Sequence, residues 1–352
     1  MKLDDLLYQD SEWLRGTGPQ SEIAMSSRIR LARNMEGLPF SHWAGKNKEE
    51  EILSLIEPAI HSSDYLKNAV FLRLDELSGL DKQFLLERHL ISHEHAEGKN
   101  HKAVVISDRE IISIMINEED HLRIQVLQSG FNLLEAWKLI SKIDRELEKK
   151  LNFAFNSRWG YLTACPTNVG TGMRASVMLH LPALVMAKQI GKVLQALDKL
   201  SIAARGLYGE GTEASGNLFQ FSNQITLGHS EEELLDNIER VVRQVVAHED
   251  EARRVLMSRN QERISDRIWR SYGTLKSARL ISSSETTVLL SMVRLGIDVG
   301  LLKTLNRAQV NRLFILSQPA HLQKIEKKTL TPMRRDVKRA DLIRKELSEH
   351  IS

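Results

Sequence analysis

The sequence predicts an α+β fold, and two observations carry that prediction. Between residues 20 and 230, segments with apolar residues at every second position are interspersed with segments of helical periodicity. From Ser230 onward the apolar spacing is helical almost throughout. A two-residue period places one face of a strand on a core, and a 3.6-residue period does the same for a helix. A mixed part followed by a helical part therefore predicts an α+β unit with an all-helical unit after it.

The mixed part contains four strand-like and four helical segments. The strand-like segments are residues 26–34, 102–108, 110–127 and 174–182, and the helical ones are residues 48–61, 80–91, 130–151 and 183–200. This part also holds 14 of the 19 glycines, as expected of a chain that turns often between short elements.

A capping box opens the helical part, because Ser230 is followed three residues later by Glu233. We expect a long helix from there, and further helices over residues 284–295, 301–306, 307–316 and 332–350. The change of pattern falls within or just after the long helix. The sequence therefore predicts two domains, residues 1–255 and residues 256–352, and the apolar positions of the second form its own core or a dimer interface.

Composition excludes several classes of protein. The 49 Lys and Arg residues are nearly balanced by 46 Asp and Glu residues, which is too even for a nucleic-acid coat or a polybasic membrane anchor. The single cysteine, Cys165, rules out an intramolecular disulfide and a cysteine-rich zinc site. The chain has neither a signal peptide nor a stretch of 18 apolar residues. We expect a cytoplasmic protein that binds neither membranes nor nucleic acid directly.

Two strand-like segments carry charged residues in an alternating pattern. In residues 26–34, Arg28 and Arg30 point to one face while Ile29 and Leu31 point into a core. Paired guanidinium forks suit phosphate, although an exposed basic strand has the same pattern.

Residues 116–125 form the second of these patterns. If the strand continues through them, Asn117, Glu119, His121 and Arg123 share one face. That face would make a polar site, and the alternative is a strand end that turns into solvent.

Two further segments combine glycines with reactive or charged residues. In the first, Cys165 precedes a proline, and a glycine-containing turn leads to a strand that Arg174 opens. A lone cysteine is usually a small buried apolar residue, and it is reactive only where its surroundings stabilise the thiolate. The second segment, residues 205–223, is glycine-rich but contains no P-loop, and the protein-kinase motifs are absent as well.

Four separated motifs together resemble the phosphagen (guanidino) kinase family, which includes creatine and arginine kinases. They are SSRIR (26–30), NEEDHLR (117–123), CPTNVGTGMR (165–174) and RGLYGE (205–210). The resemblance covers about residues 20–250. It implies an antiparallel sheet flanked by helices, similar to the catalytic domain of glutamine synthetase. It also implies phosphoryl transfer from ATP to a guanidinium, with Mg²⁺ held through the nucleotide phosphates and not by protein ligands.

The resemblance implies roles for the residues at matching positions. The phosphates of ATP would be clamped by Arg28, Arg30, Arg123, Arg174 and Arg205, and His89 would contact the nucleotide. The catalytic residues would be Glu119 and Glu210, which hold and deprotonate the guanidinium, with Cys165 beside it. The other positions expected to contact ATP are Ser26, Ser27, Ile29, Ala175, Ser176, Val177, Met178, Gly206, Leu207, Tyr208 and Gly209.

One departure from the small-molecule members makes the resemblance more specific. Those members carry a helical domain before the first motif, whereas here 25 residues precede Ser26 and a long helical segment follows. The whole chain therefore resembles the bacterial protein arginine kinases. Its RDVKRA segment matches their phosphoarginine pocket, which implies an allosteric site formed by Arg335, Asp336, Arg339 and Ala340. On a helix Arg335 and Arg339 share one face, so Asp336 could take the guanidinium and the arginines the phosphoryl group.

The resemblance predicts an ATP-dependent kinase of exposed arginines in proteins, with a role in stress response. The implied partners are a DNA-bound heat-shock repressor, damaged proteins marked for a bacterial unfoldase-protease, a zinc-binding activator protein and further copies of the chain. Two alternatives stay open at this point. One is a small-molecule kinase of free arginine, and the other is a non-catalytic phosphoarginine-binding adaptor, against which the pair Glu119 and Glu210 argues.

Overall fold

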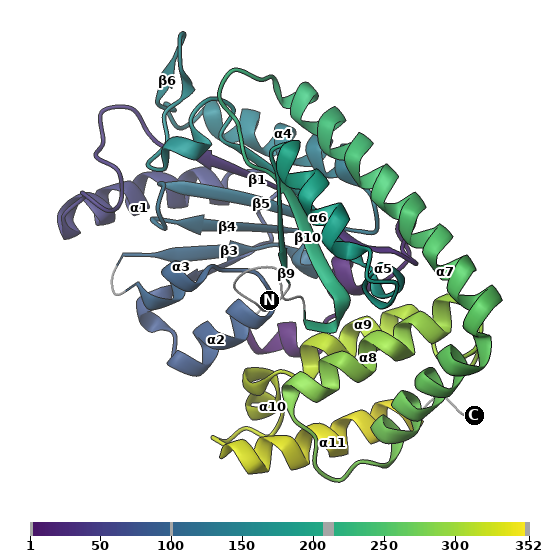
Figure 1. Cartoon of the computed structure of the whole chain (residues 1–352). Helices are drawn as coiled ribbons and strands as arrows, with labels where there is room; N and C mark the ends of the chain where they lie inside the picture. Colours follow the sequence, from purple (N-terminus) through teal and green to yellow (C-terminus); the bar gives the residue numbers. More distant parts are fainter. Residues whose placement is uncertain (1–2, 99–100, 207–214, 349–352) are drawn as a thin grey trace.

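The computed structural model describes residues 3–98, 101–206 and 215–348 and has the expected α+β architecture (Figure 1). Its centre is an eight-stranded antiparallel sheet in the order β2-β3-β4-β5-β1-β8-β10-β9. The strands are β1 (Ala24–Arg33), β2 (Val70–Arg73), β3 (Ala103–Ile106), β4 (Ile112–Ile116), β5 (Leu122–Ser129), β8 (Met173–His180), β9 (Ile202–Gly206) and β10 (Leu218–Asn223). A separate hairpin of β6 (Phe155–Asn156) and β7 (Gly160–Tyr161) projects near one end of the sheet.

Helices cover one face of the sheet, and the other face carries arginines. The covering helices are α1 (Lys46–His61), α4 (Leu133–Glu148), α6 (Ile190–Lys199) and the first half of α7 (Glu231–Ser277). On β1, Ile29 and Leu31 are buried against these helices, as the two-residue period predicts. Arg28 and Arg30 point to the opposite face and are half-buried. The strand pattern thus separates an apolar face from a cationic one.

The strand-like segment over residues 110–127 is two strands and not one. β4 ends at Ile116, β5 begins at Leu122, and the residues between them form a loop. Asn117 begins this loop with a φ of 58°, and the buried His121 accepts a hydrogen bond from the Met35 backbone N–H at 3.0 Å. The loop does not alternate between faces. The expectation that Asn117, Glu119, His121 and Arg123 share one strand face is therefore wrong.

The other predicted elements are mostly present, with shifted ends. Residues 183–200 form two helices, α5 (Pro182–Met186) and α6, because Lys188 takes a left-handed φ of 56° between them. α2 (Gly79–Glu87) ends before residue 91. The strands β2, β9 and β10 were not predicted, and the last two give strand structure to both ends of the glycine-rich segment 205–223. A short helix, α3 (His93–Glu97), was not predicted either.

The C-terminal part is helical. α7 begins with the predicted capping box, in which the Glu233 N–H donates to Ser230 Oγ at 3.1 Å, and it is interrupted at Asn260, whose φ of −138° is not helical. The helices α8 (Ser283–Asp298), α9 (Arg307–Leu316) and α11 (Pro332–Ser348) gather with its second half around a separate core (Figure 1). The short helix α10 (Pro319–Ile325) packs instead against α2. The helix predicted over residues 301–306 is a loop, because Gly300, two residues after α8, has a φ of 78° and the Leu302 N–H turns back to the Gly296 carbonyl.

A buried contact joins the helical part to the sheet. Glu87, at the end of α2, accepts hydrogen bonds from the backbone N–H groups of Ala320 at 2.8 Å and His321 at 3.2 Å, where α10 begins. The next residue, Arg88, forms a buried ion pair with Glu110 and donates to Ser11 Oγ at 2.7 Å. Because buried charges are costly without partners, these contacts fix how the two parts dock.

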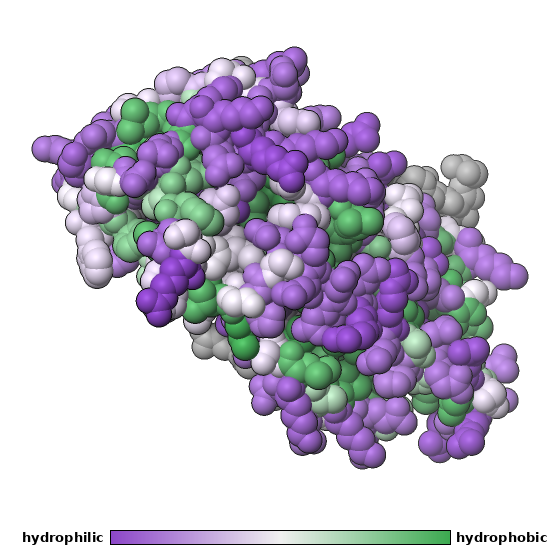
Figure 2. Space-filling view, turned by 90° about the horizontal axis from the view of Figure 1, so that it is seen from above, coloured by the Kyte–Doolittle hydropathy of each residue, from purple (hydrophilic) through white to green (hydrophobic). Residues whose placement is uncertain are grey.

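The surface gives no sign of a membrane-spanning segment. In the described parts of the chain, every helix is too short or too polar to cross a bilayer. Seen from above, the molecule is mostly hydrophilic, with apolar side chains in separate patches between charged ones (Figure 2).

Candidate active site

Four strands place five arginines on the face of the sheet opposite α1, α4, α6 and the first half of α7. Arg30 on β1 lies opposite Arg174 on β8 in the strand register. Arg28 donates from Nη2 to the Oε1 atom of Gln220 at 2.9 Å, and Gln220 is in turn the register partner of Arg205 on β9. The fifth is Arg123, which lies opposite Ala32 of β1. The structure thus brings together the five arginines that the motifs predicted. The first and the last of them, Arg28 and Arg205, are 177 positions apart in the chain.

These arginines repel one another. Burial, followed by the charges of Arg123 and Arg174, lowers the pKa of Arg28 to about 9. Burial, followed by the charges of neighbouring arginines, holds the pKa of Arg30 well below its ordinary value. Burial, followed by the charge of Arg205, lowers the pKa of Arg174. Nothing among the described residues accepts a hydrogen bond from Arg30 Nε. The face is therefore suited to a polyanion such as a triphosphate.

A pocket of about 130 Å³ lies where this face meets the β4–β5 loop. Its lining includes Arg30, Arg123, Arg174, Glu119 and Cys165. The pocket therefore places the predicted carboxylate, the predicted thiol and three phosphate-binding candidates side by side. Its other lining residues are Leu31, Ala32, Glu118, Asp120, Thr167, Asn168 and Gly172.

The two neighbouring glutamates of the loop have different surroundings. Glu118 accepts hydrogen bonds from Arg123 Nη1 at 2.6 Å and from Ser92 Oγ at 2.5 Å. Burial opposes its ionisation, but Arg123 and Ser92 outweigh burial and lower the pKa of Glu118 to about 2. Glu119 is exposed to the pocket, and burial followed by the charges of Asp120 and Glu118 raises its pKa. Glu118 is thus a permanent anion that orients Arg123, and Glu119 is the carboxylate better able to accept a proton.

Glu118 was missed at the sequence level, because strand alternation placed it on the face opposite Arg123. Glu118 and Arg123 are five residues apart, and only the turn between β4 and β5 brings them together. Their opposite charges within one short motif were the available signal.

Cys165 lies at the start of a short turn and is half-buried. Its Sγ atom is 3.0 Å from Thr167 Oγ1, and its carbonyl accepts a hydrogen bond from Thr163 Oγ1 at 2.8 Å. The loop that carries Cys165 is anchored by Asp120, which accepts a hydrogen bond from the Ala164 N–H at 2.7 Å. These contacts hold the thiol beside the arginines.

A second, smaller recess of about 20 Å³ on the same face contains His89. It is lined by Trp13, Ser26, Arg28, Leu127, Ser176, Met178 and Gln220 as well. The rings of Trp13 and His89 meet edge to face at 5.6 Å. Three predicted nucleotide-contacting residues, Ser26, Ser176 and Met178, therefore lie next to Arg28 and His89.

Several residues expected to contact ATP have side chains on the other face. Ile29, Ala175 and Val177 are buried in the core beneath the sheet. Ser27 donates to the Gly130 carbonyl at 2.9 Å and accepts a hydrogen bond from the Asn132 N–H at 2.8 Å. Gly206 is the last residue of β9. Leu207, Tyr208, Gly209 and the predicted base Glu210 lie outside the described residues.

The RDVKRA segment lies on α11, in the helical part. Arg339 is buried and donates to the carbonyls of Ser317 at 2.7 Å and Ile281 at 2.9 Å, and it also pairs with Asp336. Ala340 is buried in the helical core. Arg339 is thus occupied by the protein itself, whereas Arg335 and Asp336 remain half-exposed on the helix.

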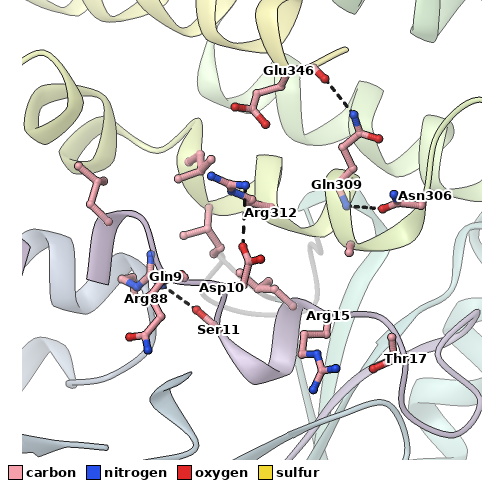
Figure 3. A pocket seen from close by; sticks show the side chains of 15 residues that line it. Gln9, Asp10, Ser11, Arg15, Thr17, Arg88, Asn306, Gln309, Arg312 and Glu346 are labelled. Carbon is pink, nitrogen blue, oxygen red and sulfur yellow. Dashed lines mark hydrogen bonds and ion pairs between the residues drawn. The ribbon is translucent and has the colours of Figure 1, made fainter. Parts of the chain in front are cut away.

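A larger cavity, of about 320 Å³, lies between the N-terminal segment and the helices α9 and α11 (Figure 3). Each of its three arginines has a carboxylate partner: Arg15 pairs with Glu12, Arg88 with Glu110 and Arg312 with Asp10. Because carboxylates already neutralise its arginines, this cavity lacks the excess positive charge of the arginine face.

His89 leads to a prediction about pH. Burial, followed by the charge of Arg28, lowers its pKa from 6.5 to about 4. Between these values the unfolded chain binds a proton that the folded protein does not, so lowering the pH favours unfolding. We expect the free energy of unfolding to fall between pH 7 and pH 5, and to fall less in His89→Asn, as measured by urea titration. The exposed His61→Asn is the control and should match wild type. Identical pH dependence of His89→Asn and wild type would contradict a neutral buried His89.

Fold and site together define an ATP:guanido phosphotransferase. The family described as ATP:guanido phosphotransferase, C-terminal catalytic domain, matches residues 51–252. Solved structures with this fold include a lombricine kinase, with a TM-score of 0.59 and 23% identity over 69% of this chain and 71% of that one. Another is the duplicated taurocyamine kinase from Schistosoma mansoni with bound transition state analog components, with a TM-score of 0.59 and 25% identity over 75% of this chain and 38% of that one.

The helical part gives the more specific match. Residues 261–351 match the protein-arginine kinase McsB C-terminal domain. A protein-arginine kinase of Halothermothrix orenii is 47% identical over 99% of this chain and 100% of its own length, and one of Moorella thermoacetica is 49% identical over 97% and 99%. The chain belongs to the protein-arginine kinase family. The predicted family, fold and enzyme class are confirmed, and these relatives do not support the free-arginine kinase or the adaptor.

Proposed function

We propose that the chain transfers the γ-phosphoryl group of ATP to arginine side chains of proteins, using the arginine face and the Glu119 pocket. The observation that carries this assignment is the juxtaposition of mutually repelling arginines with one exposed carboxylate of raised pKa. The arginines would bind the phosphates, and the carboxylate would bind the acceptor. Mg²⁺ would be held through the phosphates and would neutralise part of their charge.

The acceptor chemistry explains why a carboxylate is needed. A guanidinium has a pKa above ~12 and a delocalised lone pair, so it is a poor nucleophile until a proton leaves. Glu119 would align the planar group and accept that proton while the N–P bond forms and the bond from the γ-phosphorus to the ADP oxygen breaks. Arg30, Arg123 and Arg174 would stabilise the charge on the transferring phosphoryl group. We propose Glu210 as the second carboxylate of this site, on the basis of the family motif.

Cys165 would contribute through charge more than through a covalent bond. Its Sγ atom shares the pocket with Glu119, so a thiolate there would add a second anion beside the acceptor guanidinium. The hydrogen bond with Thr167 orients this sulfur.

We extend the proposal to location and partners on the strength of family membership. The chain would act in the cytoplasm on proteins with exposed arginines, including a DNA-bound heat-shock repressor and damaged proteins destined for an unfoldase-protease. A zinc-binding protein would activate it, and it would form a homo-oligomer. The two domains would meet within α7 near residue 255, close to the interruption at Asn260.

The substrate class is tested with γ-labelled ATP and two acceptors, free arginine and a folded protein rich in surface arginines. We expect label on the protein and far slower transfer to free arginine. The reverse preference would support the small-molecule kinase instead.

We further propose that Arg335 and Asp336 bind phosphoarginine as a regulatory ligand. Asp336→Ala should lose phosphoarginine binding in direct titration, because no other carboxylate of the RDVKRA segment can hold the guanidinium. It should keep measurable kinase activity, and activation by phosphoarginine, worth about 1–3 kcal/mol in ordinary allosteric coupling, should disappear. Asp341→Ala, on the same helix, is the control. Equal phosphoarginine binding by wild type and Asp336→Ala would refute the pocket.

A further inference from the structure

The arginine face changes character along its strands. Arg30 and Arg174, which lie opposite each other on β1 and β8, both line the Glu119 pocket. Four residues away along the same two strands, Ser26 lies opposite Met178. Because a strand rises by ~3.3 Å per residue, the two pairs are separated by about 13 Å. The face thus passes from a strongly cationic end to an end that offers a hydroxyl and an apolar side chain.

This change indicates where a bound nucleotide would place its base. The inference rests on the proposed function, because it takes the γ-phosphoryl group of ATP to lie beside Glu119. The remaining phosphates and the ribose separate that group from the base, so the base falls further along the strands, at the recess that contains His89. Apolar side chains of Trp13, Leu127 and Met178 line this recess, and such side chains are typical of sites for planar ligands.

Trp13 forms one wall of the recess, although none of the nucleotide-binding motifs includes it. It lies in a short 3-10 helix, Glu12–Leu14, which precedes the first strand. Its side chain is buried, and among the described residues nothing accepts a hydrogen bond from its indole Nε1 atom. A buried donor without an acceptor is costly, so this N–H group favours a ligand that brings an acceptor into the recess.

Hydrogen bonds from both parts of the molecule hold the segment that carries Trp13. Asn311 of α9 is buried and donates from Nδ2 to the Leu14 carbonyl at 3.1 Å. On the other side of Trp13, Ser11 Oγ donates to Glu110 Oε2 at 2.6 Å. The helical part therefore helps to fix the position of Trp13 over the sheet.

The recess must widen to admit a base. Its volume of about 20 Å³ is enough for a single water molecule. Met178 is the wall best able to give way, because a methionine side chain is unbranched and has three rotatable bonds. A base that displaces this side chain would lie against Trp13 and His89, whose rings already contact each other.

We propose that Trp13 contacts the nucleobase of ATP, and that its indole N–H donates a hydrogen bond to an acceptor atom of the base. A purine ring has several nitrogens with a free lone pair along its edge, so it offers acceptors to such a donor. The arginines hold the phosphates further along the strands, so a ligand made of phosphates alone gains nothing from Trp13. Because Asn311 holds the Trp13 segment, the helical part would contribute to nucleotide binding without contacting the nucleotide itself.

The test compares the binding of ATP with that of inorganic tripolyphosphate, both with Mg²⁺, by calorimetry. Trp13→Phe keeps an aromatic ring beside His89 and loses the N–H, so ATP should bind about three- to tenfold more weakly, the usual effect of one hydrogen bond. Trp13→Leu also loses the ring and should bind ATP more weakly still. Tripolyphosphate should bind both variants as tightly as wild type. Trp137→Phe is the matched control, because Trp137 lies on α4 and packs against the core on the other face of the sheet.

Fluorescence gives a complementary measurement of the same contact. The chain has five tryptophans, and ATP should change the emission of wild type and of Trp137→Phe. The change should be absent in Trp13→Phe, even when ATP saturates it.

Two results would overturn the proposal while leaving the proposed function intact. One is ATP affinity at the wild-type value in both Trp13 variants. The other is an equal loss of ATP and tripolyphosphate affinity, which would show that Trp13 supports the fold of the site and does not contact the base. A wild-type protein that binds neither ligand would refute the proposed function and this inference together.

Discussion

Glu119→Gln should lose phosphoryl transfer by roughly 10²–10⁴-fold, which is the usual contribution of a general base. Glutamine keeps the size of the side chain but cannot accept the guanidinium proton. Among the described residues, Glu119 forms no ion pair with the arginines, whereas Glu118 pairs with Arg123, so ATP affinity should change little in Glu119→Gln. The measurement is single-turnover transfer together with ATP titration. Near-normal transfer by a folded Glu119→Gln would remove this residue from the mechanism.

The neighbouring Glu118→Gln provides a sharp contrast. It removes the carboxylate that holds Arg123 at 2.6 Å, so it should weaken ATP binding as well as transfer. If the two variants behave alike, the division of roles between Glu118 and Glu119 is incorrect. Because burial and its acidic neighbours raise the pKa of Glu119, transfer should also increase with pH through a value above that of an ordinary glutamate.

Arg174→Ala should have the second-largest effect. It leaves phosphate oxygens without a charge-assisted donor, a loss of roughly 1.5–3 kcal/mol. ATP binding should weaken accordingly, and turnover should slow, because the same guanidinium stabilises the transferring group. The measurement is ATP titration by calorimetry, with the exposed Arg259→Ala on α7 as the control.

The stability of Arg174→Ala in the absence of nucleotide gives a second, independent prediction for this variant. Arg174 is crowded by Arg205 and Arg123, so removing it relieves repulsion in the empty site. The urea midpoint without ATP should therefore hold or rise, while the stabilisation that ATP adds should shrink. A variant that binds ATP normally would show that Arg174 faces another ligand.

The arginine face was predictable because a strand has a period of two. Once Ile29 and Leu31 are assigned to the core, Arg28 and Arg30 must face away from it, and the same argument places Arg174. The strands β9 and β10 were missed because the glycines of residues 205–223 predicted a loop over the whole segment, including the parts of the two short strands at its ends. The family motifs supplied Arg205 where periodicity did not.

The carboxylate pocket depended on geometry that no local pattern encodes. The left-handed Asn117 turns the chain out of the strand, so Glu118 reaches Arg123 and Glu119 reaches the pocket. Likewise, the sequence could not show what surrounds Arg339, a predicted residue of the phosphoarginine pocket. Its guanidinium contacts the carbonyl of Ser317, 22 residues earlier, and this contact depends on how α9 and α11 pack.

We expect the arginine face and the Glu119 pocket to phosphorylate arginines within proteins. The most direct test is mass spectrometry, under non-acidic conditions, of an arginine-rich protein incubated with ATP, Mg²⁺ and either wild type or Glu119→Gln. Wild type should leave acid-labile phosphoryl groups on arginine residues, and Glu119→Gln should leave nearly none. Phosphoryl groups on other residue types, or on free arginine alone, would contradict it.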